Sequence, residues 1–295
     1  MAFLKDELNG FVPVEQSKEI IKGIAQGSVL MKLSSVEPMK SDAKKLNVLT
    51  DGAGAYWVGE GERIKTSGAT WIHPKLVAKK LAVIIPVTKE KLEDTTIEVF
   101  NELKEVIAEA FYKAIDGAGL FGINSPFEKN ILKSATDAGN VVELGTNGDG
   151  KIDLDVSDAM ALVEDEDLDV TAFTARKGIK NALRKLRDAN GNQLYVDGVN
   201  GGEFYNNPIE FAQKGSWDKT QAEVIGGDFK KYSRIGIRAG INYEILTQAT
   251  LQGTLGADGK PISLAEQDLI AIKATMRLGY LPVKDEAFCV ITPKQ

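Results

Sequence analysis

The stretch between residues 47 and 87 constrains this chain most, because its pattern is that of a long two-stranded hairpin with little core of its own. Ala55 to Val58 is strand-like, and Gly59-Glu60-Gly61-Glu62 breaks that strand. An extended run rich in β-branched and bulky residues, Ala69 to Val87, brings the chain back. Its outer part, residues 71–75, mixes polar and apolar side chains too freely for a buried strand. An isolated two-stranded ribbon is marginally stable in water, so the hairpin either folds back on its own domain or is supported by something else.

The clearest helix is predicted over Thr95 to Asp116, where apolar residues recur at spacings of three and four. Asp94 or Thr95 can cap its first N–H groups, and Gly117 can end it. About 22 residues at ~1.5 Å each make a rod of roughly 33 Å. We expect the buried stripe of this helix to contain Phe100, Leu103, Ile107 and Phe111.

The remaining elements are predicted on periodicity and turn signals. Two long strands follow from the alternation of apolar and polar residues, Ser233 to Ile245 and Leu269 to Tyr280. Shorter elements are predicted as helices over Glu15–Gln26, Val156–Val163 and Gly178–Asp188, and as strands over Val170–Thr174 and Ala287–Thr292. The segment between residues 131 and 154 contains two turn clusters, at 137–140 and at 146–150.

The composition excludes several classes of protein. Apolar residues make up 43% and charged residues 26%, the balance of a chain with a real core. There are 36 Lys and Arg against 42 Asp and Glu, a net charge of −6, whereas proteins that grip nucleic acid along a groove carry a basic excess. The single cysteine, Cys289, forbids an intrachain disulfide. With one histidine, His73, a metal site of several His or Cys ligands cannot form within one chain.

The hydropathy pattern predicts neither a membrane span nor a secretory leader. No stretch approaches the ~18 uninterrupted apolar residues of a span. The first eight residues carry acids where a leader needs an apolar run. We therefore expect a soluble protein, made in a reducing cytoplasm, that has no contact with a membrane.

Three motifs resemble ligand sites, and each has a simpler interpretation. Residues 117–122 match the dinucleotide fingerprint, but that fingerprint begins a helix, whereas these glycines follow one and can serve as its cap and turn. Residues 147–153 resemble the front of an EF-hand loop, yet Gly145 and Val156 stand where the first and twelfth ligands belong. The acidic run from Glu164 to Asp169 is expected in solvent, because contiguous like charges repel.

Nucleophilic catalysis has little support in this sequence. A triad would have to use His73 or Cys289, but His73 lies in the hairpin before Pro74 and Cys289 lies in an apolar strand run. We therefore expect no enzymatic activity, no cofactor and no metal. A soluble calcium- or nucleotide-binding protein is the different class of function that the three motifs would support.

Several phrases along the chain become specific in combination, although each alone is weak. They are Gly54-Ala55-Tyr56-Trp57-Val58-Gly59-Glu60-Gly61, the run from Lys79 to Thr88, Ile107-Ala108-Glu109-Ala110-Phe111-Tyr112, the segment from Glu266 to Arg277, and Glu286-Ala287-Phe288. In this order the chain resembles the major capsid proteins of tailed bacteriophages over essentially its whole length.

The resemblance implies an α+β chain with the Hong Kong 97-like phage capsid fold. That fold has an N-terminal arm, an extended β-hairpin loop, a peripheral domain with a long spine helix, and an axial domain. Carried over to this sequence, the parts are the arm at 1–27, the loop at 47–86, the peripheral domain at 28–46, 87–140 and 260–285, and the axial domain at 141–259 with a return strand at 286–295.

In that family the loop lies across a neighbouring subunit, which supplies the core that the hairpin lacks. The resemblance therefore implies intersubunit contacts through Tyr56, Trp57, Glu60, Glu62, Arg63, Lys65 and Trp71. Some members also cross-link a loop lysine to an asparagine of another subunit. Lys65 is near the hairpin tip, but nothing in the sequence identifies the asparagine or a catalytic glutamate.

The implied function is structural. Many copies, arranged as hexamers and pentamers, close into the icosahedral virion capsid around double-stranded DNA, after synthesis in the cytoplasm of the bacterial host. The net charge of −6 suits a shell that contacts the packaged DNA weakly and non-specifically. A chain that starts with an arm leaves no room for a scaffolding segment, so we expect a separate scaffolding protein and a portal as partners. An encapsulin nanocompartment shell of the same fold is the alternative.

Overall fold

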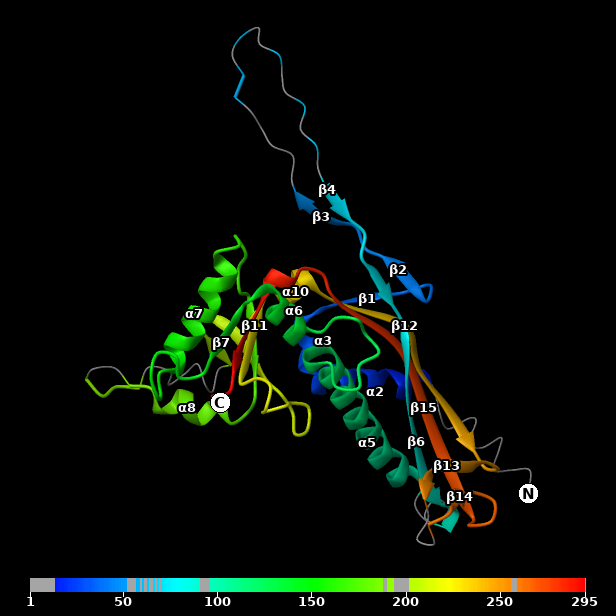
Figure 1. Cartoon of the computed structure of the whole chain (residues 1–295). Coiled ribbons are helices and arrows are strands. Elements are labelled where there is room, and N and C mark those ends of the chain that lie inside the picture. The colour runs from blue at the N-terminus through cyan, green and yellow to red at the C-terminus, as the bar shows by residue number, and fades with distance from the viewer. Residues whose placement is uncertain are drawn as a thin grey trace.

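The computed structural model describes residues 14–51, 57, 58, 60, 63, 66, 68, 70–90, 96–187, 190–193, 202–255 and 259–294. A long helix lies beside an elongated four-stranded sheet, and a second lobe is built on a six-stranded sheet (Figure 1). A narrow hairpin projects from the end of the elongated sheet, away from both lobes (Figure 1). The chain contains both helices and strands, and its two large sheets include antiparallel pairs, which agrees with the α+β prediction.

The elongated sheet has the strand order β1-β12-β15-β6. Its strands are β1 (Ser35–Pro38), β6 (Lys79–Thr88), β12 (Ser233–Leu246) and β15 (Leu269–Pro282). β15 pairs antiparallel with β12 and with β6, and β1 pairs parallel with β12. The two long strands predicted from alternation are confirmed, each to within two residues at either end.

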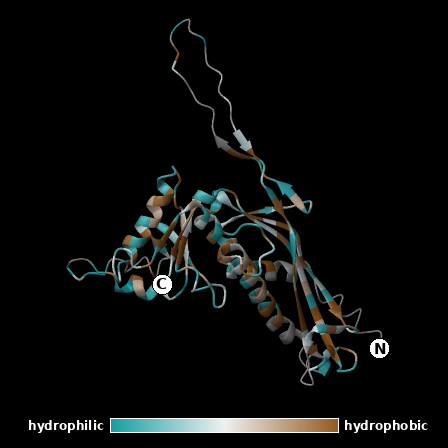
Figure 2. Cartoon of the chain, viewed as in Figure 1, coloured by the Kyte–Doolittle hydropathy of each residue, from teal (hydrophilic) through white to brown (hydrophobic). Residues whose placement is uncertain are grey.

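The alternation of β15 separates a buried from a more exposed face. Ala274, Met276, Leu278 and Tyr280 are buried, whereas Arg277 between them is exposed. Figure 2 shows the corresponding change between hydrophobic and hydrophilic segments along the long strands. In β12 the pairing register shifts on both sides of Ala239, which interrupts the strict alternation that the sequence predicts.

The long helix α5 (Thr96–Asp116) begins one residue after the predicted start and ends where predicted. Ile107 and Phe111 are buried, and Leu103 is half-buried against the core, while the side chain of Phe100 lies outside the described residues. Two N-terminal helices contact α5. They are α2 (Val14–Gly27), which matches the predicted helix to one residue at each end, and the short α3 (Val29–Leu33), which was not predicted.

The helical run does not end at Gly117, so the prediction of a cap there was wrong. It continues as a π-helical turn, η1 (Gly117–Phe121), and stops at Gly122, whose φ of 74° is the left-handed conformation of a C-cap. The glycines of the fingerprint serve close packing instead of a ligand. A Cβ on Gly119 would lie 2.3 Å from Cδ2 of Leu30, so a larger residue there would force the Leu30 side chain of α3 to move.

The second lobe has a mixed sheet with the order β7-β16-β11-β8-β10-β9. Its strands are β7 (Val141–Glu143), β8 (Ala172–Ala175), β9 (Glu203–Phe204), β10 (Asn207–Phe211), β11 (Val224–Gly227) and β16 (Phe288–Thr292). The helical elements of this part are α6 (Ile131–Ala138), α7 (Ile152–Glu164), α8 (Ile179–Lys185), α10 (Phe229–Tyr232) and the 3₁₀ turn η2 (Asp285–Ala287). The strand predicted at residues 287–292 is thus confirmed with a one-residue shift.

Several predictions in this lobe were wrong in detail. Residues 131–138 form a helix that was not predicted, and the Asn130 side chain accepts a bond from the backbone N–H of Lys133 (2.8 Å) as its N-cap. α7 begins four residues before the predicted start, with two aspartates in its first turn, where the helix dipole favours them. β8 lies about two residues later than predicted, and α8 ends at Lys185 instead of residue 188.

The elongated sheet draws strands from distant parts of the sequence. β12 lies within residues 141–259, the range that the resemblance assigned to the axial domain, yet it pairs along its length with β15. The antiparallel pair β13 (Thr250–Leu255) and β14 (Pro261–Ser263) follows it. Residues 233–246 therefore belong to the same sheet as the long strand 269–282.

The hairpin consists of two short strand pairs in succession. β2 (Ala43–Lys45) pairs with β5 (Lys75–Val77) at the root, and β3 (Val48–Asp51) pairs with β4 (Thr70–Ile72) farther out. The predicted run 69–87 is thus divided into β4, β5 and β6, with breaks at His73-Pro74 and Ala78. The strand predicted at 55–58 is not observed at Trp57 and Val58, and residues 55 and 56 lie outside the described residues. Within the described part of the chain, no helix is long and apolar enough to cross a membrane.

Candidate intersubunit interface

The hairpin carries large apolar side chains that its own subunit leaves uncovered. We call Leu49, Trp57, Trp71, Ile72 and Val77 the hairpin surface. Trp57 is fully exposed, Trp71 is 52% exposed, and the other three are also exposed. Of the other predicted contact residues, Glu60 and Arg63 are exposed, whereas Tyr56, Glu62 and Lys65 lie outside the described residues. Exposed apolar groups gathered on one projection are typical of a surface that binds another molecule.

The root of the hairpin is packed rigidly onto the elongated sheet. Leu76 of β5 is fully buried with Met39 and Leu46. Beneath this cluster two glycines, Gly236 of β12 and Gly279 of β15, stand opposite each other in the sheet. A Cβ on Gly236 would lie 2.3 Å from the Met39 sulfur, and one on Gly279 would lie 2.7 Å from the carbonyl oxygen of Val77. The root therefore approaches the sheet at a distance that only glycine allows.

Ion pairs add to this contact between root and sheet. Glu37 of β1 accepts hydrogen bonds from Lys44 (2.5 Å) and Arg234 (3.0 Å). The bond from Lys44, followed by the charges of both cations, keeps the pKa of Glu37 below its usual value despite partial burial. Asp42 pairs with Arg238 and, at 3.5 Å, with Arg277. These pairs are partly exposed, so they orient the root more than they stabilise it.

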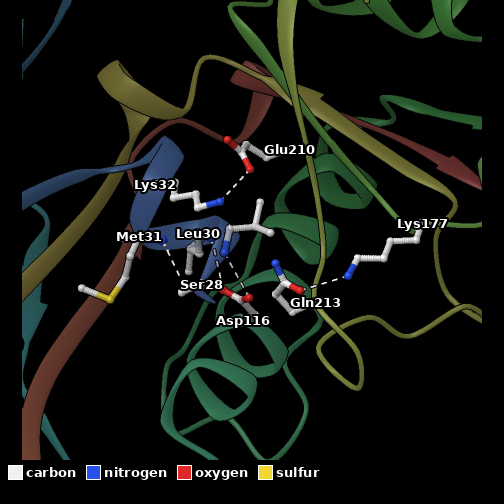
Figure 3. A network of polar contacts seen from close by, with 9 residues as sticks. Ser28, Leu30, Met31, Lys32, Asp116, Lys177, Glu210 and Gln213 are labelled. Atoms are coloured by element: carbon white, nitrogen blue, oxygen red, sulfur yellow. Dashed lines mark hydrogen bonds and ion pairs between the residues drawn. The ribbon is translucent and has the colours of Figure 1, made fainter. Parts of the chain in front are cut away.

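A buried carboxylate joins the end of α5 to α3 (Figure 3). Asp116 accepts hydrogen bonds from the Ser28 hydroxyl (2.5 Å) and from the backbone N–H groups of Val29 (3.2 Å) and Leu30 (3.2 Å). Ser28 in turn accepts the N–H of Met31 (3.1 Å). Burial raises the pKa of Asp116 to about 6, although the hydrogen bonds oppose that rise. The carboxylate thus holds the N-terminal helices against the long helix.

The same short helix also reaches the second lobe. Lys32 of α3 forms an ion pair with Glu210 of β10 (2.9 Å), and Figure 3 shows this pair beside the Asp116 network. Farther out, Lys177 donates to the side-chain oxygen of Gln213 (3.0 Å). Helix α3 is therefore a joint between the long helix and the six-stranded sheet.

The motifs that resembled ligand sites have structural partners. Asp155 accepts the backbone N–H groups of Gly145 (2.7 Å) and Asn147 (3.0 Å), and Asp149 pairs with Lys294 (2.7 Å). The acidic run 164–167 and Asp169 are exposed. Among the described residues, no cluster of three or more His, Cys, Asp or Glu side chains could hold a metal ion.

The surroundings of the single histidine and the single cysteine differ from those of a prepared nucleophile. The exposed His73 contacts the Asn47 side-chain oxygen through Nδ1 (2.9 Å), at the outer part of the hairpin. Cys289 is buried in β16, and burial raises the pKa of its thiol to about 12. A thiol with so high a pKa stays protonated at neutral pH and is a poor nucleophile.

Comparison with known proteins decides the family. The profile described as the phage capsid family matches residues 9–292. The chain belongs to the phage capsid family. The major capsid protein of Staphylococcus phage 80alpha is 36% identical over 291 residues, which cover 98% of this chain and 87% of that protein.

Solved structures agree with the family assignment. A structure from Microbacterium phage Oxtober96 matches with a TM-score of 0.76 at 28% identity, covering 90% of this chain and 91% of that chain. One from Mycobacterium phage Adephagia matches with a TM-score of 0.74 at 29% identity, covering 92% and 91%. The prediction of a phage major capsid protein with a Hong Kong 97-like fold is confirmed, and the calcium- or nucleotide-binding and encapsulin alternatives are not favoured.

Membership in the phage capsid family also decides the general partner and location. Proteins of this family assemble in multiple copies into the shell of the virion, so this subunit associates with copies of itself. The hairpin surface is a candidate for this contact.

Proposed function

We propose that each subunit lays its hairpin on a neighbouring subunit, and that this contact, repeated between hexamers and pentamers, closes the icosahedral head of a tailed phage around its double-stranded DNA. One observation carries the proposal: apolar side chains of the hairpin surface are uncovered, although the root beneath them is buried and tightly packed. A rigid root presents the tip in a defined direction. A neighbour can then supply the burial that a two-stranded ribbon lacks.

The contacts assigned to Tyr56, Trp57, Glu60, Glu62, Arg63, Lys65 and Trp71 are part of this proposal. Trp57 and Trp71 provide apolar area, and the charged residues provide orientation, because charge complementarity selects the register of an interface more than its affinity. The buried positions Ile107 and Phe111 on α5 support the scaffold on which the hairpin is mounted.

The domain division follows the sheets. We propose that the peripheral domain contains the elongated sheet and α5, and so includes residues 233–246 together with 28–46, 87–140 and 260–285. The axial domain then contains the six-stranded sheet, whose strands come from residues 141–227 and from the return strand 288–292. The hairpin and the arm 1–27 complete the subunit. Within the range 47–86 that was assigned to the hairpin, residues 79–86 form part of β6 and so go with the elongated sheet, and α2 of the arm packs on α5.

The further partners are a separate scaffolding protein, a portal, and DNA contacted weakly and non-specifically. The net charge of −6 supports the last of these, because a shell must release and inject the DNA that it encloses. We expect synthesis in the cytoplasm of the host and no catalytic activity, since the single histidine is exposed on the hairpin and the single cysteine is buried in β16.

The hairpin proposal is tested by deleting residues 61–68 and comparing the variant with the parent. The unassembled variant should unfold at the temperature of the parent, because changes at an exposed tip usually alter stability by no more than about 0.5 kcal/mol. Negative-stain microscopy and sedimentation, alone and with a scaffolding protein, should show shells from the parent and none from the variant. A matched control removes the exposed turn 190–193 of the second lobe and should still assemble. Normal shells from the hairpin variant would mean that the hairpin is dispensable for assembly.

A further inference from the structure

A cavity of about 510 Å³ opens at the C-terminal end of α5, beside the first residues of β6. Its size lies within the range of roughly 300–1,000 Å³ that is typical of pockets that enclose a small molecule or a large side chain. The wall is mainly apolar and includes Leu81, Ile115, Ala118, Ile123, Phe127 and Leu278.

The rim of the cavity is positively charged. It carries Lys79 and Lys80 from β6 and Lys113 from α5. Lys113 pairs with Glu109 one helical turn earlier. Among the described residues no carboxylate forms an ion pair with Lys79 or Lys80; the nearby Glu244 is bonded to Lys273 (2.6 Å), and the charge of Lys80 contributes only the last of the effects that lower the pKa of Glu244. An apolar cavity with a lysine rim is suited to a large apolar side chain that has a carboxylate close to it in the same molecule.

The hairpin tip has the complementary chemistry. Trp57 is fully exposed, and Glu60, also exposed, follows three residues later. Farther along, Glu62 is followed in the sequence by Arg63 and Lys65, so Glu60 is the acid of the tip that stands closest to Trp57 in the sequence. A tryptophan side chain buries about 150–250 Å² when it enters a pocket, and it is the residue type most enriched at the centre of protein interfaces.

The hairpin of the same subunit points away from its own cavity. Lys79 follows the root strand β5 after the single residue Ala78, so the cavity lies at the base of the hairpin. Trp57 lies six residues beyond the end of β3, and Figure 1 shows the hairpin projecting outward from the sheet. The group that fills the cavity must therefore come from another molecule.

We propose that this cavity receives Trp57 of a second copy of the chain, with Glu60 of that copy on the Lys79–Lys80 rim. This inference rests on the proposed function, since it names the place on the neighbour where the hairpin docks. It makes the hairpin tip and the cavity the two complementary surfaces of each subunit. The same subunit offers a tip to one neighbour and a cavity to another, which is a heterologous contact of the kind that closes rings.

Cross-linking tests the position of the tip in shells. The variant with Val58→Cys and Ile123→Cys keeps Trp57 and places one thiol beside the tip and one in the cavity wall. The native Cys289 is buried and does not compete. Treatment of shells with a short bismaleimide should produce a ladder of covalent multimers on a denaturing gel. The control pairs Val58→Cys with Leu154→Cys, a position on α7 that is 43% exposed, as is Ile123, and should leave monomers.

The outcomes distinguish this inference from the proposed function. Shells without a ladder from the cavity pair, or equal ladders from both pairs, would overturn the assignment of the cavity. Failure of the parent chain to form shells under any condition would instead overturn the proposed function.

A charge exchange provides a second readout that needs no cysteine. Glu60→Lys, and separately Lys79→Glu with Lys80→Glu, should each raise the protein concentration required for assembly at least tenfold. The triple variant that carries both changes should recover most of that loss, because attraction is restored with opposite signs. A triple variant that assembles no better than either parent variant would show that these groups do not meet. Trp57→Ala should raise the required concentration more than Trp57→Phe, which keeps an aromatic ring for the cavity.

Discussion

Replacing Asp116 by asparagine should change the pH dependence of the stability of the subunit. Burial raises the pKa of this carboxyl to about 6, from an ordinary value of 3.8. Between these two pH values the folded chain holds a proton that the unfolded chain has released. The free energy of unfolding therefore falls as the pH rises from about 4 to about 6. A difference of about 2 pH units, at ~1.36 kcal/mol per unit, corresponds to roughly 3 kcal/mol.

The asparagine variant cannot ionise, so it lacks this loss. At pH 4 it should be less stable than the parent by about 1–3 kcal/mol, because its NH₂ group replaces an acceptor oxygen that faces the N–H groups at the start of α3. As the pH rises to 7, the stability of the variant relative to the parent should improve by roughly 3 kcal/mol. Ser28→Ala should instead make the stability of the subunit depend more strongly on pH. It removes a hydrogen bond that lowers the pKa of the Asp116 carboxyl, so that pKa should rise further.

The assay is urea unfolding of the unassembled subunit at several pH values between 4 and 7. Asp149→Asn is the control, since this exposed carboxyl has a pKa lowered by its bond to Lys294. A carboxyl with a lowered pKa stabilises the folded parent less as the pH falls. The stability of Asp149→Asn relative to the parent should therefore not increase as the pH rises. A difference between parent and Asp116→Asn that stays constant within about 0.5 kcal/mol across the range would refute the reasoning.

Three further results are expected from the packing. Phe111→Ala should destabilise the subunit by roughly 3–5 kcal/mol in urea unfolding, whereas Val106→Ala, at an exposed position of the same helix, should change it by less than about 0.5 kcal/mol. Gly236→Val should lower the stability by about 1–3 kcal/mol in the same assay, since its side chain would collide with Met39 at the hairpin root; an unchanged value would mean that the root can move. Calcium should leave the melting temperature unchanged, and calorimetry should detect no dissociation constant below about 10 μM, because the carboxylates of the EF-like segment already bind Lys294 and backbone N–H groups.

The elements that the sequence predicts well are those in which the apolar residues recur with one clear period. The strands at 233–246 and 269–282 alternate over many residues, and α5 repeats every three to four residues, so local pattern and burial agree. The short helix α6 was missed because its start depends on the Asn130 side chain rather than on periodicity. The π-turn η1 was missed for a related reason, since a glycine-rich segment is expected to end a helix unless a neighbour such as Leu30 packs against it.

The hairpin contacts remain a prediction. The family resemblance named Trp57 and Trp71 among them, and both side chains are exposed in the subunit. The pair Gly236 and Gly279 was not found, because nothing in either strand shows that a distant hairpin root would pack across it. Asp116 was also missed, since a lone acid at the end of an amphipathic helix is ordinarily exposed. A buried serine directly before an apolar run, Ser28, is the one signal that could have suggested a partner.

Folding and the proposed hairpin contact involve different surfaces of this subunit. The root of the hairpin and the Asp116 network are buried within one chain, so substitutions there should alter the unfolding of the isolated subunit. The hairpin surface is exposed in that chain, so substitutions there should leave unfolding unchanged and alter only the concentration at which shells form. Because every subunit in a shell repeats the same contact, a loss of ~1.4 kcal/mol at each one is a tenfold loss in each association constant, and these losses compound around the closed shell. Small changes at the tip should consequently have much larger effects on assembly than changes of equal free energy in the core.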